Sequence, residues 1–199
     1  MNEIGISTEE KIIFAAEKVF TEKGYAASRT RNIAEKAGIN AALLNYYFRS
    51  KEKLFQKVMN RKALLLCENL LPIFTDENTS LKRKVEQIVD VYIDLLSENP
   101  NLPLFVIGEI QKNDFGFFNS FPLKEILGNS NIINQLKEID SKINPLHFLM
   151  NLLSMCVFPF IAKPILTNFS LMNDTEFQTF VNQRKQLIPK WFEVNMVSK

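Results

Sequence analysis

The sequence contains few of the residues on which most enzyme active sites are built. It has one histidine, two cysteines and six glycines among its 199 residues. Cys67 and Cys156 lack the spacing of a metal site, and there is no glycine-rich loop to hold a phosphate and no nucleophile motif. We therefore expect no enzyme activity, no metal and no cofactor. The cysteines fit buried thiols in a reducing compartment, the cytoplasm.

Long apolar runs are also scarce, and only the stretch from Leu146 to Leu166 approaches the length of a membrane span. It contains His147, Asn151, Lys163 and two prolines, and such polar groups are costly in lipid. We expect a buried helix at an interface and no membrane contact. Near the start of the chain, acidic residues from Glu3 onwards interrupt any signal peptide.

Strand-like alternation of apolar and polar residues is rare, whereas helical spacing recurs, so we predict an all-α fold. Ser7 and Glu10 form a capping box that begins the first helix, and Gly24 is expected to end it. The fourth helix is expected to stop before Pro72, and prolines are expected to kink or shorten the last two. Helices are predicted over 30–37, 41–48, 51–71, 81–98, 104–112, 145–164 and 175–197, with one or two more between 123 and 142.

Positive charge is concentrated in one part of the chain. Between Ser28 and Lys62 there are nine basic residues and two acidic ones, a net charge of +7, which leaves −5 for the rest. A basic block in an otherwise acidic protein indicates a surface for a polyanion, although a solvated charged face is the simpler alternative.

The helices over 30–37 and 41–48, joined through Gly38, have the size of a helix-turn-helix. Gly38 suits a turn that needs positive φ, and Asn40 is a good N-cap for the second helix. Apolar residues pin the two helices against the first helix of the chain: Ile33, Ala34, Ala37, Leu44 and Phe48. The second helix then exposes a face that fits the DNA major groove.

The motifs of this region resemble the signature of TetR-family transcriptional regulators over roughly residues 8–55. They are Gly24-Tyr25, Arg31-Asn32-Ile33-Ala34, Ala37-Gly38-Ile39, Tyr47-Phe48 and Ser50-Lys51-Glu52-Lys53-Leu54. The resemblance implies a sequence-specific DNA-binding regulator, a ligand-responsive homodimeric repressor on a palindromic operator. It also implies a DNA-binding domain over 1–53, followed by a larger helical domain for ligand binding and dimerisation over 54–199.

The resemblance also implies roles for single residues. Thr30 and Arg31 match positions that contact phosphate and sometimes a base, and Tyr47 and Lys51 match positions that grip phosphates. The sequence departs from the common pattern at Asn45 and at Ala41-Ala42, which leaves the reading helix few hydrogen-bond donors. We therefore assign most base discrimination by hydrogen bonds to Arg31 and Asn45. The predicted DNA-binding residues are Thr30, Arg31, Asn40, Ala41, Ala42, Leu43, Asn45, Tyr46, Tyr47 and Lys51.

The last two helices carry apolar stripes wider than one core contact needs, and the resemblance implies that they pair across a two-fold axis. The alternative is that both are plain internal core. The predicted interface residues are Leu149, Leu153, Val157, Phe180, Arg184, Leu187, Ile188 and Trp191.

Phenylalanine is abundant, with 17 residues, and many fall between Phe105 and Phe160. A cavity lined by aromatic rings, for an apolar or aromatic small-molecule effector, fits this richness. Glu109 and His147 are polar groups that would orient such a ligand or serve as satisfied structural residues. The predicted lining residues are Phe105, Glu109, Phe115, Phe118, His147, Phe148 and Asn151.

Two alternatives remain open from the sequence: a ligand-independent DNA-binding protein of the same fold, and a helical protein-interaction module without DNA binding. The interaction module would not need Gly38, the Asn40 cap and the Lys51 helix start at these spacings. The sequence does not identify the operator, the effector or the regulated genes, and it does not separate repression from activation.

Overall fold

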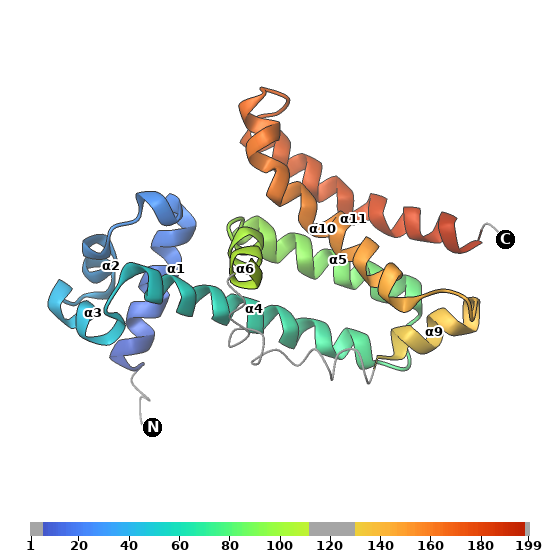
Figure 1. Ribbon diagram of the computed structural model, residues 1–199, viewed down its shortest axis with the longest axis horizontal. Helices are drawn as coiled ribbons and strands as arrows, with labels where there is room; N and C mark the ends of the chain where they lie inside the picture. The colour runs from blue at the N-terminus through green and yellow to red at the C-terminus, as the bar shows by residue number, and fades with distance from the viewer. Residues whose placement is uncertain (1–5, 112–129, 198–199) are drawn as a thin grey trace. The chain divides into compact units, whose positions relative to one another are not determined.

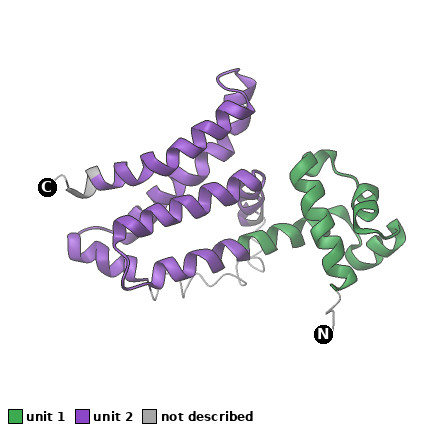
Figure 2. Ribbon diagram, turned by 180° about the vertical axis from the view of Figure 1, so that it is seen from behind, with its two compact units in different colours: residues 1–63 green, residues 64–199 purple. Residues whose placement is uncertain are grey.

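The computed structural model describes residues 6–111 and 130–197, and these residues form helices and no strands, as predicted (Figure 1). Contacts within the chain divide it into two compact units, residues 1–63 and 64–199 (Figure 2). Unit 1 includes the first part of α4, where Leu54, Val58 and Met59 are buried. The division into a DNA-binding domain over 1–53 and a larger domain over 54–199 stays a prediction.

Unit 1 contains α1 (Thr8–Ala27), α2 (Thr30–Ala37), α3 (Ala41–Phe48) and the first part of α4 (Lys51–Thr75). The capping box is present at the start of α1, where the Ser7 and Glu10 side chains each bond the other residue's backbone N–H. Gly24 has a φ of +71°, and helical geometry is interrupted there before a short continuation to Ala27. The predicted bounds of α2 and α3 are confirmed.

Unit 2 contains the rest of α4, α5 (Leu81–Glu98), α6 (Leu102–Gln111), α9 (Asn131–Ile139), α10 (Pro145–Asn168) and α11 (Asp174–Val197). Helix α5 lies at its centre and packs against α11, α10 and α9, while α10 also packs against α11 and α6. Cys67 and Cys156 are buried and free. Burial raises the pKa of the Cys67 thiol to about 11 and that of Cys156 to about 12, so both stay protonated at neutral pH.

Three expected helix boundaries near prolines are corrected by the structure. Helix α4 continues past Pro72 to Thr75, and α10, expected to end at Pro164, continues to Asn168. Helix α6 begins at Leu102, so Pro103 lies in its first turn, where the missing N–H has no intrahelical acceptor to lose. A proline inside a helix deprives only the carbonyl four residues earlier of its partner, and that loss can be made good by another group.

Such a replacement is visible where α10 and α11 meet. Pro159 has no N–H to donate to the Met155 carbonyl, and Arg184 of α11 donates to that oxygen from Nε at 3.2 Å and from Nη2 at 2.8 Å. Aromatic pairs on both sides of this bond, Phe148–Phe192 and Phe160–Phe177, pack edge to face. The Arg184 guanidinium therefore replaces the hydrogen-bond donor that Pro159 lacks, and it links α11 to α10.

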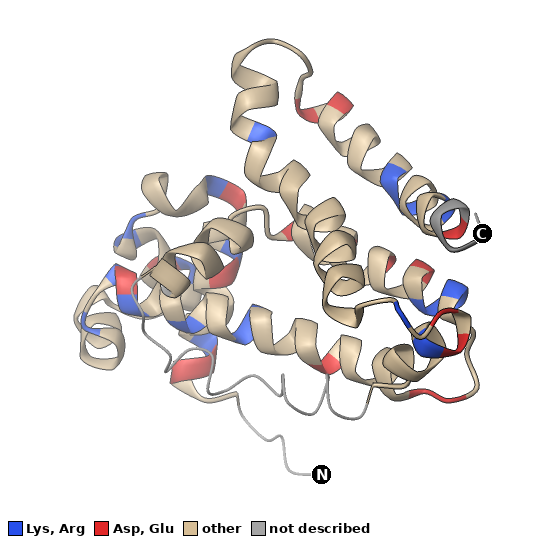
Figure 3. Ribbon diagram, turned by 45° about the vertical axis from the view of Figure 1, so that its right-hand side comes forward, with Lys and Arg blue, Asp and Glu red and all other residues tan. Residues whose placement is uncertain are grey.

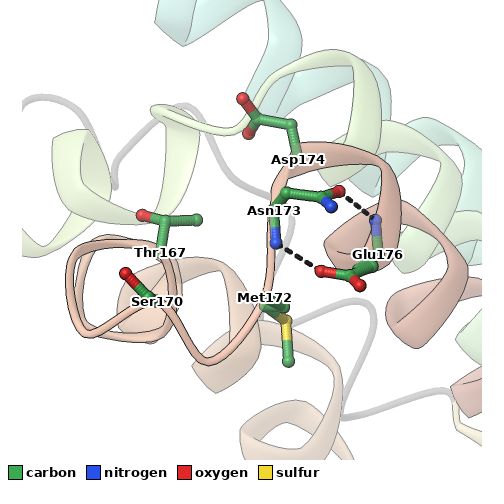
Figure 4. A pocket seen from close by; sticks show the side chains of 6 residues that line it. All are labelled: Thr167, Ser170, Met172, Asn173, Asp174 and Glu176. Atoms are coloured by element: carbon green, nitrogen blue, oxygen red, sulfur yellow. Dashed lines mark hydrogen bonds between the residues drawn. The ribbon is translucent and has the colours of Figure 1, made fainter.

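The turn between these helices is closed by polar groups (Figure 4). Asn173 Oδ1 accepts the Glu176 N–H at 2.9 Å, and the Asn173 N–H donates to Glu176 Oε2 at 2.7 Å. Lys163 pairs with Asp174 at 2.6 Å, and this hydrogen bond lowers the pKa of the Asp174 carboxyl. A hollow of about 430 Å³ lies at the turn. Because the polar groups that line this hollow bond each other, we interpret the turn as a helix cap.

Lys84 is the exceptional residue of α5, because its side chain is 0% exposed and its ammonium has no hydrogen-bond partner. Burial lowers the pKa of this lysine below its usual value of 10.5, against the opposing effect of Asp76 and Glu77. A buried ammonium without a hydrogen-bond partner lowers the stability of the folded state.

We expect Arg184→Met to lower the free energy of unfolding by about 1.5–3 kcal/mol, since a charge-assisted hydrogen bond is lost. In a Pro159→Ala background the loss should be smaller, because the new N–H can donate to the Met155 carbonyl. Urea unfolding of the two single variants and the double variant, at one protein concentration, measures the coupling. Equal losses in both backgrounds would show that Arg184 does not act through this carbonyl.

We expect Lys84→Met to raise the free energy of unfolding by about 1–3 kcal/mol, since an unpartnered buried donor is removed. Its advantage should shrink as the pH rises toward 10.5, because the folded state of the wild type binds fewer protons than the unfolded state and so gains stability with pH. Thermal unfolding across pH measures both effects. Lys82→Met, at an exposed position on the same helix, is the control and should change stability little. A destabilised Lys84→Met protein would mean that the ammonium has a partner in solution.

Candidate functional site

The turn between α2 and α3 positions the predicted reading helix. Gly38 ends α2 with φ +69° and ψ 31°, a left-handed conformation that glycine adopts without steric cost. Asn40 then caps α3, its Oδ1 accepting the Leu43 N–H at 2.8 Å. Ile33 and Ala34 of α2 and Leu44 and Phe48 of α3 are buried, so the two helices are held as one motif.

The opposite face of α3 is open to solvent. Asn40, Ala41, Ala42 and Asn45 are exposed, and Leu43 is half-buried. Tyr46 is 79% exposed, whereas Tyr47 is 40% exposed and packs edge to face on Tyr46 at 5.5 Å. The predicted residues of α3 therefore all lie outside the core, while Phe48 alone of the three consecutive aromatic residues joins it.

Helix α2 contributes two predicted residues at its start. Thr30 is half-buried, and the Arg31 side chain is 85% exposed. Arg31 Nε pairs with Glu35 at 3.1 Å, one turn further along the same helix. An exposed pair of this kind contributes little to stability, so the guanidinium can leave Glu35 for a better acceptor at small cost.

Lys51 has a structural role that its sequence position did not reveal. Its ammonium donates to the Tyr25 carbonyl at 3.0 Å and to the Ser28 carbonyl at 3.1 Å, and it lies 4.2 Å from the centre of the Tyr25 ring. The Ser28 hydroxyl, also missed from the sequence, donates to the Gly24 carbonyl at 2.6 Å. Together these bonds join the end of α1 to the start of α4.

The predicted effector residues are not gathered into one described cavity. Phe105 of α6 is buried, and Phe148 is buried against Phe192. His147 and Asn151 lie on the exposed side of α10. Phe115, Phe118 and the Glu109 side chain lie outside the described residues.

The predicted interface residues of α10 and α11 fall into two groups. Leu149 and Ile188 are buried within unit 2, so they cannot form an outer surface. The remaining six are half-buried or exposed: Leu153, Val157, Phe180, Arg184, Leu187 and Trp191. The exposed stripe of α10 passes through Leu146, Met150 and Phe158, which are all more than half exposed, so its register differs from that of the predicted set.

Helix α10 is also the one helix of the described residues that is long and apolar enough to span a membrane, and only 22% of its apolar window is buried. Length and composition are weak evidence for a span. Its buried side, with Leu152, Cys156 and Phe160, packs against α5, α6 and α11.

Comparison with known proteins identifies the helix-turn-helix. Residues 12–58 match the family described as "Bacterial regulatory proteins, tetR family". The "Probable HTH-type transcriptional regulator YttP" of Bacillus subtilis is 26% identical over 86% of each chain. The "HTH-type transcriptional repressor NicS" of Pseudomonas putida is 42% identical over 43% of this chain and 42% of its own.

The fold agrees with these similarities over most of the chain. A TetR-like transcriptional regulator from Rhodococcus sp. RHA1 superposes with a TM-score of 0.56, covering 96% of this chain and 97% of that one at 18% identity. The helix-turn-helix of this chain is therefore that of the tetR family of bacterial regulatory proteins, and the described residues share the fold of TetR-like regulators.

Proposed function

We propose that the protein is a homodimeric, effector-responsive repressor in the cytoplasm that binds a palindromic operator. The observation that carries the proposal is the outward face of α3, where Asn40, Asn45 and Tyr46 stand exposed on a helix whose other side is fixed in the core. Side-chain amides pair with base edges in the major groove, and a helix of this motif fits that groove.

Base recognition by this face would depend on few hydrogen bonds. Ala41 and Ala42 offer only methyl groups, which suit the thymine methyl. Asn45, in the middle of α3, carries an amide whose oxygen and nitrogen can both hydrogen-bond adenine. Arg31 can add a second direct contact from α2 once it leaves Glu35.

Dimerisation is supported by the apolar outer face of α10 and α11. Phe158 is 63% exposed, and Trp191 and Leu187 are exposed on α11. An apolar groove of about 410 Å³ lies beside them, lined by residues of both helices that include Phe158, Phe180 and Arg184. Contiguous apolar surface of this kind marks an interaction site. A second copy satisfies it with the two-fold symmetry that a palindromic operator requires.

An effector site in unit 2 is supported by its buried aromatic residues. Phe105 of α6 and Phe148 of α10 come from helices that contact each other. An apolar or aromatic molecule fits such surroundings better than a charged one does. Binding would alter operator affinity by a coupling of about 1–3 kcal/mol, the usual range for allosteric proteins.

We expect Asn45→Ala to reduce the preference for the cognate operator by about 1–3 kcal/mol, because one bidentate base contact is lost. Affinity for scrambled DNA should change little, since phosphate contacts remain. Fluorescence anisotropy at fixed salt, with DNA from upstream of the protein's own coding region and a scrambled duplex, measures both. Asn134→Ala, at an exposed position in unit 2, is the matched control. Equal weakening on both duplexes would remove Asn45 from base recognition, and no selective binding by the wild type would refute the proposed function.

We expect Phe158→Glu to convert the dimer into a monomer. Phe158 lies near the middle of α10, so in a two-fold interface it would face its own copy, and two carboxylates would then repel each other. Sedimentation velocity measures the oligomeric state. Leu104→Glu, which alters an exposed apolar residue of α6, is the control and should leave the dimer intact. A Phe158→Glu protein that stays dimeric would place the interface elsewhere.

A further inference from the structure

Lys and Arg recur along the helices of unit 1 (Figure 3). The nine between Ser28 and Lys62 are not equivalent in the folded protein, because only some of their side chains have partners. Five of the nine are engaged inside unit 1: Arg31 with Glu35, Lys36 with Glu22, Lys62 with Glu17, Arg61 with the Phe14 ring, and Lys51 with two carbonyls. The other four are exposed, and their side chains make no ion pair or hydrogen bond within the described part of the chain: Arg29, Arg49, Lys53 and Lys57.

Three of these four follow one another at intervals of four residues: Arg49, which ends α3, and Lys53 and Lys57 in the first two turns of α4. Lys53 and Lys57 lie one helical turn apart on the same side of α4, with their Cα atoms about 6 Å apart along its axis. Leu54 and Val58, their neighbours in sequence, are buried in the core of unit 1 and fix the rotation of the helix. The lysine side of α4 therefore faces outward. Arg49 precedes it, next to the capping residue Ser50, whose hydroxyl accepts the Lys53 N–H.

Arg49 is held in an unusual backbone conformation. It ends α3 with φ +58°, whereas the other two described residues of unit 1 with positive φ are Gly24 and Gly38. A side chain at such a position costs about 1–2 kcal/mol relative to glycine. Strain of this kind is a recognised mark of functional positions. Here it places a guanidinium at the last turn of the reading helix.

We propose that Arg49, Lys53 and Lys57 form a basic ridge that contacts the phosphate backbone beside the groove occupied by α3. The inference rests on the proposed DNA-binding function and extends its footprint beyond the helix-turn-helix. DNA is the fitting polyanion because the ridge starts where the reading helix ends. In addition, the 6 Å step between the lysines is close to twice the 3.4 Å axial rise of phosphates on one strand.

The ridge differs in kind from Lys51, although all four residues lie within nine positions of the sequence. The Lys51 ammonium already donates to two backbone oxygens, so it acts mainly by positioning α4. The side chains of the ridge residues have no such partners among the residues of unit 1 that the structure describes. Each phosphate they neutralise would release a condensed counterion, so their contribution should depend on salt and not on sequence.

The test is the full-length triple variant Arg49→Gln, Lys53→Gln, Lys57→Gln. The slope of log affinity against log salt, measured with a short random duplex between about 50 and 200 mM, should fall by about 2.7, or 0.9 for each lost contact. The ratio of affinities for cognate and scrambled DNA should be unchanged. The charge-matched control Lys137→Gln, Lys142→Gln, Lys190→Gln changes exposed residues of unit 2 and should keep the wild-type slope.

A single variant separates DNA contact from folding. Arg49→Gly should raise the melting temperature, because glycine relieves the positive φ, while it lowers the salt slope by about 0.9. A variant that is more stable yet binds DNA less strongly cannot be explained by damage to the fold. A lower melting temperature with an unchanged slope would assign Arg49 a structural role and overturn its place in the ridge.

The remaining outcomes are equally decisive. A triple variant that keeps the wild-type slope, with selective binding intact, would refute the ridge and leave the proposed function standing. Absence of DNA binding by the wild type would refute the proposed function itself. Wild-type binding to phosphatidylserine vesicles that the triple variant loses, with its DNA slope unchanged, would assign the ridge to an anionic membrane surface and overturn the proposal.

Discussion

The arrangement of the DNA-binding unit depends on the bonds of the Lys51 ammonium. This group belongs to the first residue of α4. It donates hydrogen bonds to two carbonyls at the junction of α1 and α2, and it lies against the Tyr25 ring. Tyr25 in turn packs with Phe20 and Phe55. The Lys51 cation and these rings together hold the end of α1 against the start of α4, and α2 and α3 lie between these two points in the chain. Because α2 and α4, the neighbours of α3 in the chain, are held in this way, the exposed face of α3 has a fixed orientation within unit 1.

Unit 2 is organised by a different constraint, the double-sided character of α10. One side packs against α5, α6 and α11, and the other presents Phe158 and its apolar neighbours outward. A helix with two apolar sides reads as a membrane span by composition alone. Arg184 resolves the ambiguity locally, because it bonds the Met155 carbonyl that Pro159 leaves free and stacks near Phe180 and Trp191. A guanidinium among aromatic rings suits the centre of a protein interface better than the hydrocarbon of a bilayer.

Sequence patterns predicted those elements that are determined by neighbouring residues. The bounds of α2 and α3 followed from the local signals Gly38 and Asn40, whose capping bonds reach only three or four residues along the chain. The exposure of the α3 residues was predicted from the helical spacing of the apolar residues that face inward. The partners of Lys51 were not predicted, since they lie 23 and 26 residues away and the backbone carbonyls of Tyr25 and Ser28 carry no sequence signal. The bond from Arg184 to the Met155 carbonyl was likewise not predicted, because Arg184 is 29 residues from the carbonyl to which it donates. On α10, Leu149 and Phe158 are equally apolar in sequence, and only the packing shows that the first is buried and the second exposed.

The two buried thiols have a practical consequence for studies of motion in this protein. Cys67 and Cys156 are the only cysteines of the chain, and both are inaccessible and protonated. A cysteine introduced on the surface would therefore be the one thiol that reacts with a maleimide probe, without any need to remove the natural ones. Spin or fluorophore labels placed on α3 of each copy in a dimer would then report the separation of the two reading helices directly, with and without DNA.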